Sequence, residues 1–305
     1  MPEPRGEIAV VGATGLLGGA ICRTLCARGE SVRAIVRPAT DRAVRNRLKQ
    51  LGARVLEGDV EVPASLDAGF AGVDAVVSTA SAFPRDPRPD AIDRVDRDGQ
   101  LAVVTAAEQA RVRRIVYVSF PTIPFDFPFQ RAKRAVEERL RASTIDHVVL
   151  QPAKFMDVWF TPPLGFDLEG RVKLYGGGTS PQSWVAVADV AEVAVRVLRL
   201  EEASRETLSF GGPEALRQVD VVRAFEHAFG RSLETESVAV SELEAMQAAA
   251  VAPVEASFAA ILLDATLPER IEPSPLVERL GLSWTSVADF ATAQRSGGEA
   301  RHPAR

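Results

Sequence analysis

Through its first half, the chain alternates between short runs of apolar, largely β-branched residues and longer stretches with apolar residues at helical spacing. The short runs are apolar almost throughout, as is typical of strands buried on both faces of a sheet. Strands are predicted at Ile8–Val11, Val32–Val36, Arg54–Leu56, Ala75–Ser78, Ile115–Val118 and His147–Leu150. Helices are predicted between them at Leu16–Arg28, Arg42–Leu51, Ala91–Ala110 and Gln130–Ala142. This alternation with short connections predicts an α/β fold with a doubly wound parallel sheet and right-handed crossovers.

The pattern becomes less regular after Pro152. A loop is predicted at Gly176-Gly177-Gly178, because consecutive glycines interrupt both helices and strands. A strand and turn are predicted at Leu208–Pro213, and helices at Ala188–Leu200, Ala215–Phe229, Ser241–Ala265 and Ser286–Gln294. We therefore expect a sheet domain over residues 1–152, a mixed segment over 153–295 that completes the sheet and forms a smaller C-terminal lobe, and a disordered polar tail over 296–305.

Composition and charge narrow the classes of function. The chain has 305 residues, 46% of them hydrophobic, which is enough to bury one full-size core. Its net charge of −5 provides no basic surface for nucleic acid. Because no apolar run approaches the length of a membrane span and the first residues lack a signal-peptide pattern, we expect a cytoplasmic protein without a membrane partner. The sequence is compatible with a monomer or a homodimer.

The metal-ligating residue types are few and scattered. Cys22 and Cys26 are one helical turn apart, a spacing that is poor for a disulfide and supplies only two zinc ligands. The histidines, His147, His227 and His302, are far apart in the sequence. We therefore expect reduced thiols and no metal site.

The strongest motif directly follows the first predicted strand, where Gly12-Ala13-Thr14-Gly15-Leu16-Leu17-Gly18 has the spacing G-x-x-G-x-x-G. The first glycine permits a tight turn, the second lets the backbone approach a pyrophosphate, and the third lets the helix pack closely on the sheet. The helix that follows directs free N–H groups and a partial positive charge at the phosphates. The motif predicts a Rossmann-type dinucleotide site made by Gly12, Thr14, Gly15, Leu16, Leu17 and Gly18.

The end of the second strand distinguishes the two nicotinamide dinucleotides. An NAD-specific site usually has Asp or Glu there, to accept a hydrogen bond from the ribose 2′-hydroxyl. This chain has Arg37 instead, with Arg42 a few residues later. Because a guanidinium suits a 2′-phosphate, we expect NADP, as NADPH, to be preferred over NAD. The alternative is that Arg37 is a solvated loop residue.

Further residues fit the same cofactor in register with the order of the strands. Asp59 follows the third strand, where its carboxylate could accept a hydrogen bond from the adenine amino group. Thr79, Ala80 and Ser81 follow the fourth strand, where small side chains would let the nicotinamide ribose lie close. The predicted cofactor set is completed by Val60, Lys133, Pro152 and Phe155.

These features resemble the atypical and extended short-chain dehydrogenase/reductases, in particular the NmrA-like branch that includes quinone and isoflavone reductase relatives. The resemblance covers roughly residues 6 to 230 and implies an NADPH-dependent oxidoreductase. Its N-terminal motifs are specific for nucleotide binding, and the later ones only for the family. The matching stretches are Val11–Gly18, Gly58-Asp59, Arg114–Ser119, Phe129–Lys133 with Glu137, Gln151–Met156 and Val187–Ala191.

The resemblance also implies catalytic residues, with one departure. The family's pattern is Tyr-x-x-x-Lys, with a serine at the end of the preceding strand. The tyrosine exchanges a proton with the substrate oxygen, the lysine lowers the tyrosine pKa and binds the nicotinamide ribose, and the serine orients the carbonyl. Ser119 and Lys133 occupy matching positions, but Phe129 stands where the tyrosine belongs. Helical spacing places Phe129 and Lys133 on one helix face.

Several explanations of Phe129 remain open. Lys133 could itself be the general acid or base, with its pKa lowered by burial and by the cofactor's positive charge. Asp126, Tyr175 or Tyr117 could replace the tyrosine, although Tyr117 lies within a strand and is more typical of core. Hydride could also pass to a conjugated carbon or quinone, with solvent supplying the proton. In the last alternative the chemistry is lost and the domain only senses the redox state of its nucleotide.

Substrate contacts are expected where chain segments leave the carboxyl edge of the sheet, because ligands of open α/β sheets lie there. The segments are Ser81–Asp90, Phe120–Phe129 and Ala153–Phe166, all rich in aromatic residues or proline. Such walls suit a flat hydrophobic or aromatic substrate, although any single aromatic residue among them could be core. The predicted substrate residues are Phe83, Phe120, Phe129, Trp159 and Trp184, the last closing the pocket from a substrate-binding lobe.

The sequence therefore favours an NADPH-dependent reductase that transfers hydride to a small, largely apolar or aromatic carbonyl, enone or quinone. Ser119 and Lys133 would polarise the acceptor oxygen. Two alternatives remain open. One is a redox-neutral isomerase or epimerase with tightly bound nucleotide, and the other is a non-catalytic NADP-binding redox sensor or regulator.

Overall fold

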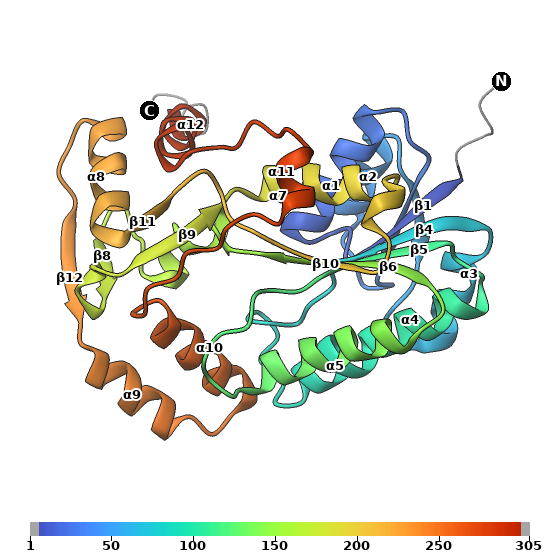
Figure 1. Cartoon of the computed structure of the whole chain (residues 1–305), viewed down its shortest axis with the longest axis horizontal. Coiled ribbons are helices and arrows are strands. Elements are labelled where there is room, and N and C mark those ends of the chain that lie inside the picture. Colours follow the sequence, from blue (N-terminus) through green and yellow to red (C-terminus); the bar gives the residue numbers. More distant parts are fainter. Residues whose placement is uncertain (1–5, 300–305) are drawn as a thin grey trace.

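The computed structural model describes residues 6–299, and a parallel seven-stranded sheet with the order β10-β6-β5-β4-β1-β2-β3 lies at its centre (Figure 1). All neighbouring strands of this sheet pair in parallel. The strands are β1 (Glu7–Val11), β2 (Val32–Val36), β3 (Arg54–Glu57), β4 (Val73–Ser78), β5 (Arg114–Val118), β6 (Asp146–Pro152) and β10 (Glu206–Phe210). The inner strands are buried on both faces, which explains their continuous apolar runs.

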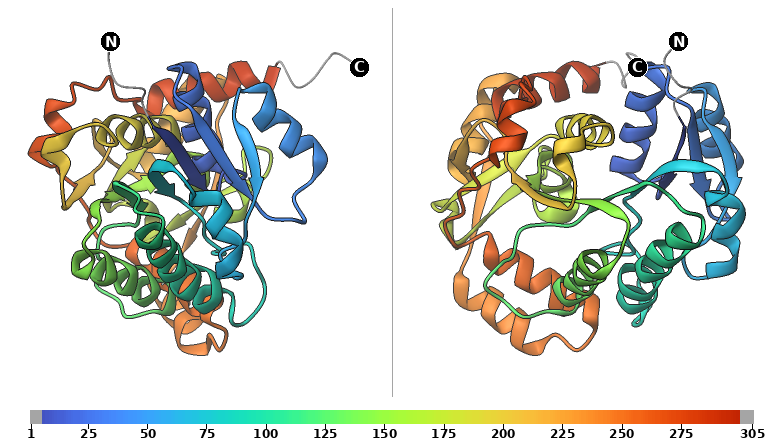
Figure 2. Two further views of the ribbon diagram at one scale, coloured as in Figure 1. Left: turned by 90° about the vertical axis from the view of Figure 1, so that its right-hand side faces the viewer. Right: turned by 45° about the vertical axis from the view of Figure 1, so that its right-hand side comes forward.

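Helices cover both faces of the sheet (Figures 1 and 2), as the sequence predicts for a Rossmann-type fold. One face packs against α1 (Leu16–Ala27), α2 (Arg42–Gln50) and α7 (Val187–Val197). The other packs against α3 (Asp67–Phe70), α4 (Gln100–Gln109) and α5 (Pro128–Ala142). A π-helical segment, Ile92–Gly99, leads directly into α4. The two apolar clusters between these layers fix the carboxyl edge of the sheet, where the sequence predicts the cofactor.

The second half of the chain contributes strand β10 to the edge of the sheet. It also forms a smaller lobe, which we call the C-terminal lobe (Figure 1). Its strands are β7 (Lys154–Phe155), β9 (Pro181–Val185) and β11 (Ala215–Arg217) in one sheet, and β8 (Arg171–Tyr175) with β12 (Glu234–Val238) in another. Its helices are α6 (Met156–Trp159), α8 (Gln218–Phe229), α9 (Val240–Ala249), α10 (Pro253–Asp264) and α12 (Val287–Glu299), whereas α11 (Pro275–Arg279) packs against β10 on the sheet face that α1 and α7 cover. Single 3₁₀ turns occur at Pro63–Leu66, Pro162–Leu164, Gly176–Gly178 and Glu201–Ala203.

Helix α10 connects the C-terminal lobe back to the sheet domain, because it packs along α5 (Figure 1). The two helices are also joined by a hydrogen bond, in which the backbone N–H of Phe129 donates to Ser257 Oγ at 3.1 Å. Ala260 and Phe129 belong to the same apolar cluster. This contact places α10 opposite the carboxyl ends of β5 and β6, where it forms a wall of the site described below.

The C-terminal half differs from the predicted elements in several places, and its strands β7, β8, β9 and β12 were not predicted. The helix expected over Ala215–Phe229 begins only at Gln218, because residues 215–217 pair with β9 as β11. The helical region expected over Ser241–Ala265 consists of two short helices, α9 and α10, and Pro253 occupies the first turn of α10. The expected disordered tail is wrong for residues 296–299, which continue α12, while residues 300–305 lie outside the described part of the chain. Within residues 6–299, no helix is both long and apolar enough to cross a membrane.

Candidate active site

At the junction of β1 and α1, the positions of Gly12 and Gly18 have no room for a side chain. Gly12 has a φ of +83°, and a Cβ there would lie 2.7 Å from the backbone nitrogen of Ala80. A Cβ on Gly18 would lie 2.1 Å from the carbonyl oxygen of Gly12. Thr79, directly after β4, bonds to the end of β1, because its hydroxyl donates to the Val11 carbonyl at 3.1 Å. The glycines therefore allow β1, β4 and α1 to meet at close range, as predicted from their spacing.

The first turn of α1 leaves its backbone amides available to a ligand. Its N-cap residue is Gly15, so no side chain caps the helix, and no acidic residue lies in the first turn. Thr14, Gly15 and Leu16 are exposed, and the Leu16 side chain remains 46% accessible although it is large and apolar. Uncapped N–H groups at the positive end of a twelve-residue helix suit a pyrophosphate. The residues present therefore fit a dinucleotide.

Two exposed arginines follow β2, where the sequence places the 2′-phosphate. Arg37 comes directly after the strand, and Arg42 is the first residue of α2. Asp41 caps α2 by accepting a hydrogen bond from the Ala43 N–H at 2.6 Å, so it is already engaged. Asp59 accepts from the Glu61 N–H at 3.0 Å, and Val60 is buried beside it.

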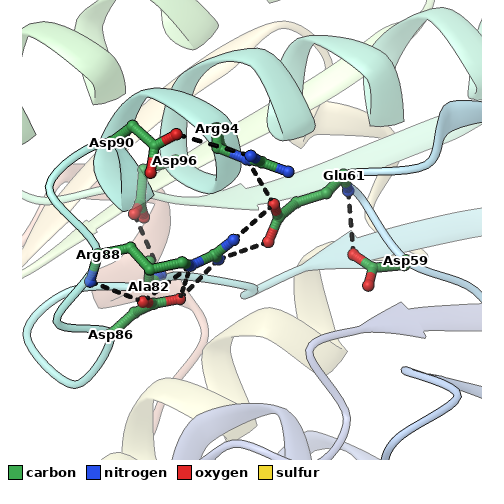
Figure 3. Close-up of polar contacts among 8 residues, drawn as sticks. All are labelled: Asp59, Glu61, Ala82, Asp86, Arg88, Asp90, Arg94 and Asp96. Carbon is green, nitrogen blue, oxygen red and sulfur yellow. Dashed lines mark hydrogen bonds and ion pairs between the residues drawn. The ribbon is translucent and has the colours of Figure 1, made fainter.

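A network of charged residues fixes the loop over residues 81–90 (Figure 3). Arg88 donates to Glu61 at 2.6 and 3.0 Å and to Asp86 at 2.7 Å, and Arg94 donates to Glu61 at 2.7 Å. Hydrogen bonds from Arg88 hold the pKa of Asp86 below its ordinary value, and the charge of Arg37 lowers it further. At the start of the loop, the buried carboxylate of Asp96 accepts from the Ala82 N–H at 3.1 Å. The loop is therefore held at both ends.

An apolar cavity of about 310 Å³ lies between the carboxyl edge of the sheet and α10. It brings together both predicted catalytic residues, Ser119 and Lys133, and four of the predicted substrate residues, Phe83, Phe120, Phe129 and Trp159. Predicted cofactor residues that also line it are Leu17, Thr79, Ser81, Lys133, Pro152 and Phe155. The other predicted cofactor residues lie outside the cavity lining: Gly12, Thr14, Gly15, Leu16, Gly18, Arg37, Arg42, Asp59, Val60 and Ala80. Because some predicted cofactor residues line the cavity and the others lie outside it, the arrangement suits an extended ligand that reaches the cavity with one end.

Trp184 does not close the cavity, contrary to the expectation from sequence. It is only 1% exposed, its indole N–H donates to the Leu216 carbonyl at 3.1 Å, and its ring lies behind Trp159 with centroids 5.9 Å apart. Trp184 belongs to the core of the C-terminal lobe because β9, which carries it, lies between β7 and β11.

The Lys133 ammonium lies deep in the cavity wall. Its Nζ donates to the Val118 carbonyl at 3.1 Å and lies 5.0 Å from the Tyr117 ring centroid. Burial lowers the pKa of Lys133 below its ordinary value, while the carboxylates of Asp96 and Glu137 act to raise it. A lysine in this environment can give up a proton more readily than one in water.

Ser119 and Phe129 complete this part of the wall. The Ser119 hydroxyl donates to Glu137 Oε1 at 2.6 Å, which fixes the orientation of its oxygen. The Phe129 ring stacks on Phe83 and Phe120, with centroids 4.6 and 5.3 Å apart, and lies 5.3 Å from the Lys133 Nζ. Position 129, where the family resemblance predicts a tyrosine, therefore lies within a three-ring aromatic stack.

The hydroxyl and acid groups suggested as replacements for the tyrosine do not line the cavity. Asp126 is 79% exposed and paired with Arg131 at 2.8 Å. The Tyr175 hydroxyl donates to the Leu164 carbonyl at 3.0 Å, and burial raises its pKa to about 12. The Tyr117 hydroxyl is buried without a hydrogen-bond partner among the described residues, and burial raises its pKa well above the ordinary value. Lys133, in contrast, lines the cavity, and its Nζ lies beside the Phe129 ring of the aromatic stack.

Three ionisable residues that the sequence reasoning missed also line the cavity: Lys154, Asp264 and Glu269. Lys154 occurs in the family-like stretch Gln151–Met156, but nothing in that stretch gave it a chemical role. Asp264 and Glu269 are single acids near the end of the apolar segment 258–263. A charged residue beside an apolar helix is the only signal the sequence offers for either of them.

The turn, its uncapped helix and the adjoining cavity define a dinucleotide-binding α/β protein. Residues 12–201 match the NAD(P)H-binding family, and the chain belongs to that family. The match confirms the predicted kind of cofactor and the resemblance on which the catalytic positions were assigned.

Similar proteins have more than one kind of role. The photosystem II assembly factor Ycf39 of Synechocystis sp. is 26% identical over 247 residues, which cover 79% of this chain and 73% of that protein. The NAD(P)H azoreductase of Xenophilus azovorans is 29% identical over 255 residues, covering 79% of each. The NADPH-dependent quinone oxidoreductase QOR2 of Escherichia coli, solved with NADPH, has the same fold, with a TM-score of 0.75 at 20% identity over 94% of this chain and 99% of that one.

Proposed function

We propose that the chain is an NADPH-dependent reductase that transfers hydride to a small, largely apolar or aromatic carbonyl, enone or quinone. The observation that carries the proposal is an aromatic cavity lined by Ser119, Lys133 and the residues that follow β4 and β6. Two of the similar proteins are named as nicotinamide-dependent reductases, which supports the same reaction class.

The cofactor-binding residues act at separate points along the dinucleotide. The amides at the start of α1 bind the pyrophosphate, and Arg37 and Arg42 bind the 2′-phosphate. Asp59 accepts a hydrogen bond from the adenine, and Thr79 and Ser81 leave space for the nicotinamide ribose. NADPH, when bound, supplies the hydride.

Lys133 supplies the proton in this proposal. An ammonium has three N–H donors, and Val118 accepts from one of them, so two remain for a ribose hydroxyl and the substrate oxygen. Lys133 would give its proton to the oxygen of the acceptor when the adjoining carbon is reduced, and solvent would then restore the proton to Lys133. Ser119 donates to the same oxygen once its hydroxyl turns from Glu137, and the aromatic stack excludes water.

The direct test measures the loss of NADPH absorbance when purified protein is mixed with a panel of quinones and enones, with menadione as the simplest quinone. Turnover of a flat conjugated acceptor is expected. If no acceptor is reduced although NADP raises the unfolding temperature, the protein binds its nucleotide without this chemistry.

A non-catalytic nucleotide-binding regulator is the second candidate, because two observations favour it. Phe129 removes the family's proton donor, and its ring is packed against Phe83 and Phe120 rather than leaving space for a hydroxyl. An assembly factor is among the similar proteins. This candidate predicts that the protein binds the nucleotide but reduces no acceptor of the panel.

Replacing Arg37 by aspartate should shift cofactor preference toward NADH. The carboxylate repels the 2′-phosphate and can accept from a 2′-hydroxyl, so the NADPH-to-NADH ratio of kcat/KM should fall by about 10-fold to 100-fold, the size expected for a charge-assisted hydrogen bond. The measurement is steady-state kinetics with both cofactors.

The matched control is Arg47→Asp, which makes the same change of charge at an exposed position of α2. It should leave the cofactor ratio within about twofold, since it removes a charge away from the strand end. An unchanged ratio in Arg37→Asp would remove this arginine from the 2′-phosphate site.

A further inference from the structure

A second polar site lies in the otherwise apolar wall of the cavity. It consists of Lys154 from β7, Asp264 at the end of α10 and Glu269 in the segment that follows α10. Lys154 Nζ donates to Asp264 Oδ2 at 2.7 Å and to Glu269 Oε2 at 2.6 Å. We call these three residues the Lys154 cluster. Its nearest aromatic neighbour is Trp159, whose ring centroid lies 6.0 Å from the Nζ.

The Lys154 cluster is buried and held by several elements. The side chains of Lys154, Asp264 and Glu269 are 9%, 7% and 17% exposed. The Glu269 backbone N–H donates to the Pro181 carbonyl at 2.8 Å, and the Ile271 N–H donates to Ser183 Oγ at 2.9 Å, which ties the segment to β9. The carboxylates therefore keep fixed positions relative to the cavity.

Each carboxylate of the Lys154 cluster retains one free acceptor. Asp264 Oδ1 and Glu269 Oε1 accept no hydrogen bond from the described residues. Neither atom is among the fully buried atoms that lack a hydrogen-bond partner, so both remain accessible. With both acids ionised, one lysine and two carboxylates carry a formal charge of −1. Burial raises the pKa of Glu269, and the charge of Asp264 also raises it. These free acceptors favour a hydrogen-bond donor over a further anion.

We propose that the Lys154 cluster is a substrate subsite that binds a hydroxyl or ammonium group carried by an aromatic substrate. The aromatic body of this substrate occupies the cavity, and its donor group bonds to Asp264 Oδ1 and Glu269 Oε1. Lys154 is a positioning residue, since it holds both carboxylates while using its own donors on them. The reaction at Lys133 rests on the proposed function, whereas binding at the Lys154 cluster can be measured without any turnover.

Three naphthalene probes test the subsite with the full-length protein loaded with NADP⁺. Calorimetry should show that 2-naphthol and 2-naphthylmethylammonium bind at least about 10-fold more tightly than 2-methoxynaphthalene, which has the same body without a donor. The tighter of the two donor probes identifies whether the preferred group is a hydroxyl or a cation. Equal affinities for all three probes would overturn the subsite.

Two isosteric variants locate the preference. Asp264→Asn and Glu269→Gln each replace an acceptor by an amide that can turn an N–H toward the ligand, so the preference for donor probes should fall to about twofold or less. Glu244→Gln, at an exposed position of α9, is the matched control and should keep the full preference. NADP⁺ affinity and unfolding temperature identify any variant that fails to fold, and the wild-type comparison stands without the variants.

A structural ion pair would tie β7 to α10 without affecting which probe binds. Full donor preference in both variants would therefore assign the Lys154 cluster to stability alone. Menadione, which has no donor group, separates this proposal from the reductase proposal. A protein that distinguishes the naphthalene probes but reduces neither menadione nor any other acceptor of the panel would refute the reductase and retain the subsite.

Discussion

Replacing Gly18 by alanine should abolish NADPH binding and destabilise the fold by about 3 kcal/mol, the upper part of the range for overpacked cores. The added Cβ would lie 2.1 Å from the Gly12 carbonyl oxygen and 2.8 Å from Thr79 Oγ1. Neither atom can move without a large cost in free energy. The Gly12 carbonyl is backbone of the turn, and the Thr79 hydroxyl bonds β4 to β1. Relief requires α1 to move away from the sheet, which displaces the amides at its N-terminus.

The neighbouring residue supplies the control. A Cβ on Gly19 would meet only the Ala13 carbonyl oxygen, at an ordinary 3.5 Å. Gly19→Ala should therefore leave NADPH affinity unchanged and raise stability by about 0.5–1 kcal/mol, as alanine does in a helix interior. Thermal unfolding with and without NADPH, together with calorimetry, measures both effects. Full NADPH affinity in the Gly18 variant would contradict the close approach of α1 to the turn.

Replacing Lys133 by methionine should lower kcat by at least about 100-fold while NADPH still binds. Methionine keeps the length and apolar contacts of the side chain but removes the proton that general acid catalysis requires, a contribution of about 10²–10⁴ in rate. The larger loss should therefore appear in kcat, while NADPH affinity should fall by about 10-fold or less, because only one hydrogen bond to the ribose is removed. Stopped-flow measurement of a single turnover separates the hydride step from product release.

The pH dependence gives an independent readout of the same residue. Lys133 donates only when it is protonated, and burial lowers its pKa below the ordinary value of 10.5. Wild-type kcat should therefore fall as the pH rises through that lowered pKa, and the Lys133→Met profile should lack this fall. Lys49→Met, at an exposed position of α2, is the control and should retain the wild-type profile. An unchanged kcat in Lys133→Met would exclude the lysine as proton donor.

The sheet domain could be predicted from sequence because its information is local. Parallel strands buried on both faces are continuously apolar, so β1, β2 and β5 stand out from the helices between them. The glycine turn was equally readable, since its spacing follows from the close contact of Gly18 with Gly12. The position of the dinucleotide site at the carboxyl edge of the sheet could therefore be predicted from the first twenty residues and the order of the strands.

The cavity wall could not be predicted in the same way, because it depends on contacts between distant segments. β12 is mostly exposed and polar, and β7 has only two residues, so neither has a clear strand pattern. The packing of α10 on α5 brings Asp264 into the cavity, and no local pattern shows this. Trp184 shows the converse, since an aromatic residue next to a glycine loop can equally well be core.

Asp96 is a further case in which local sequence is misleading. It lies among charged residues in Ile92–Gly99, a segment that has the composition of a solvated helix face. The structure buries Asp96 completely, where it accepts from the Ala82 N–H. Burial raises the pKa of Asp96, and the nearby Lys133 opposes that rise. The π-helical geometry of this segment, rather than its composition, directs the carboxylate inward.

The charged network of the 81–90 loop makes the aromatic cavity sensitive to ionic strength. Phe83 stacks on Phe129, yet the loop that carries Phe83 is fixed through Arg88, whose side chain is 40% exposed to solvent. Added electrolyte weakens such pairs through the exposed side of Arg88, although pairs in direct contact, such as Arg88–Glu61 at 2.6 Å, are screened less than charges that lie farther apart. A high salt concentration would therefore weaken the Phe83 side of the cavity, although this side is apolar. KM for an uncharged acceptor would then rise, while the core of the sheet would remain intact.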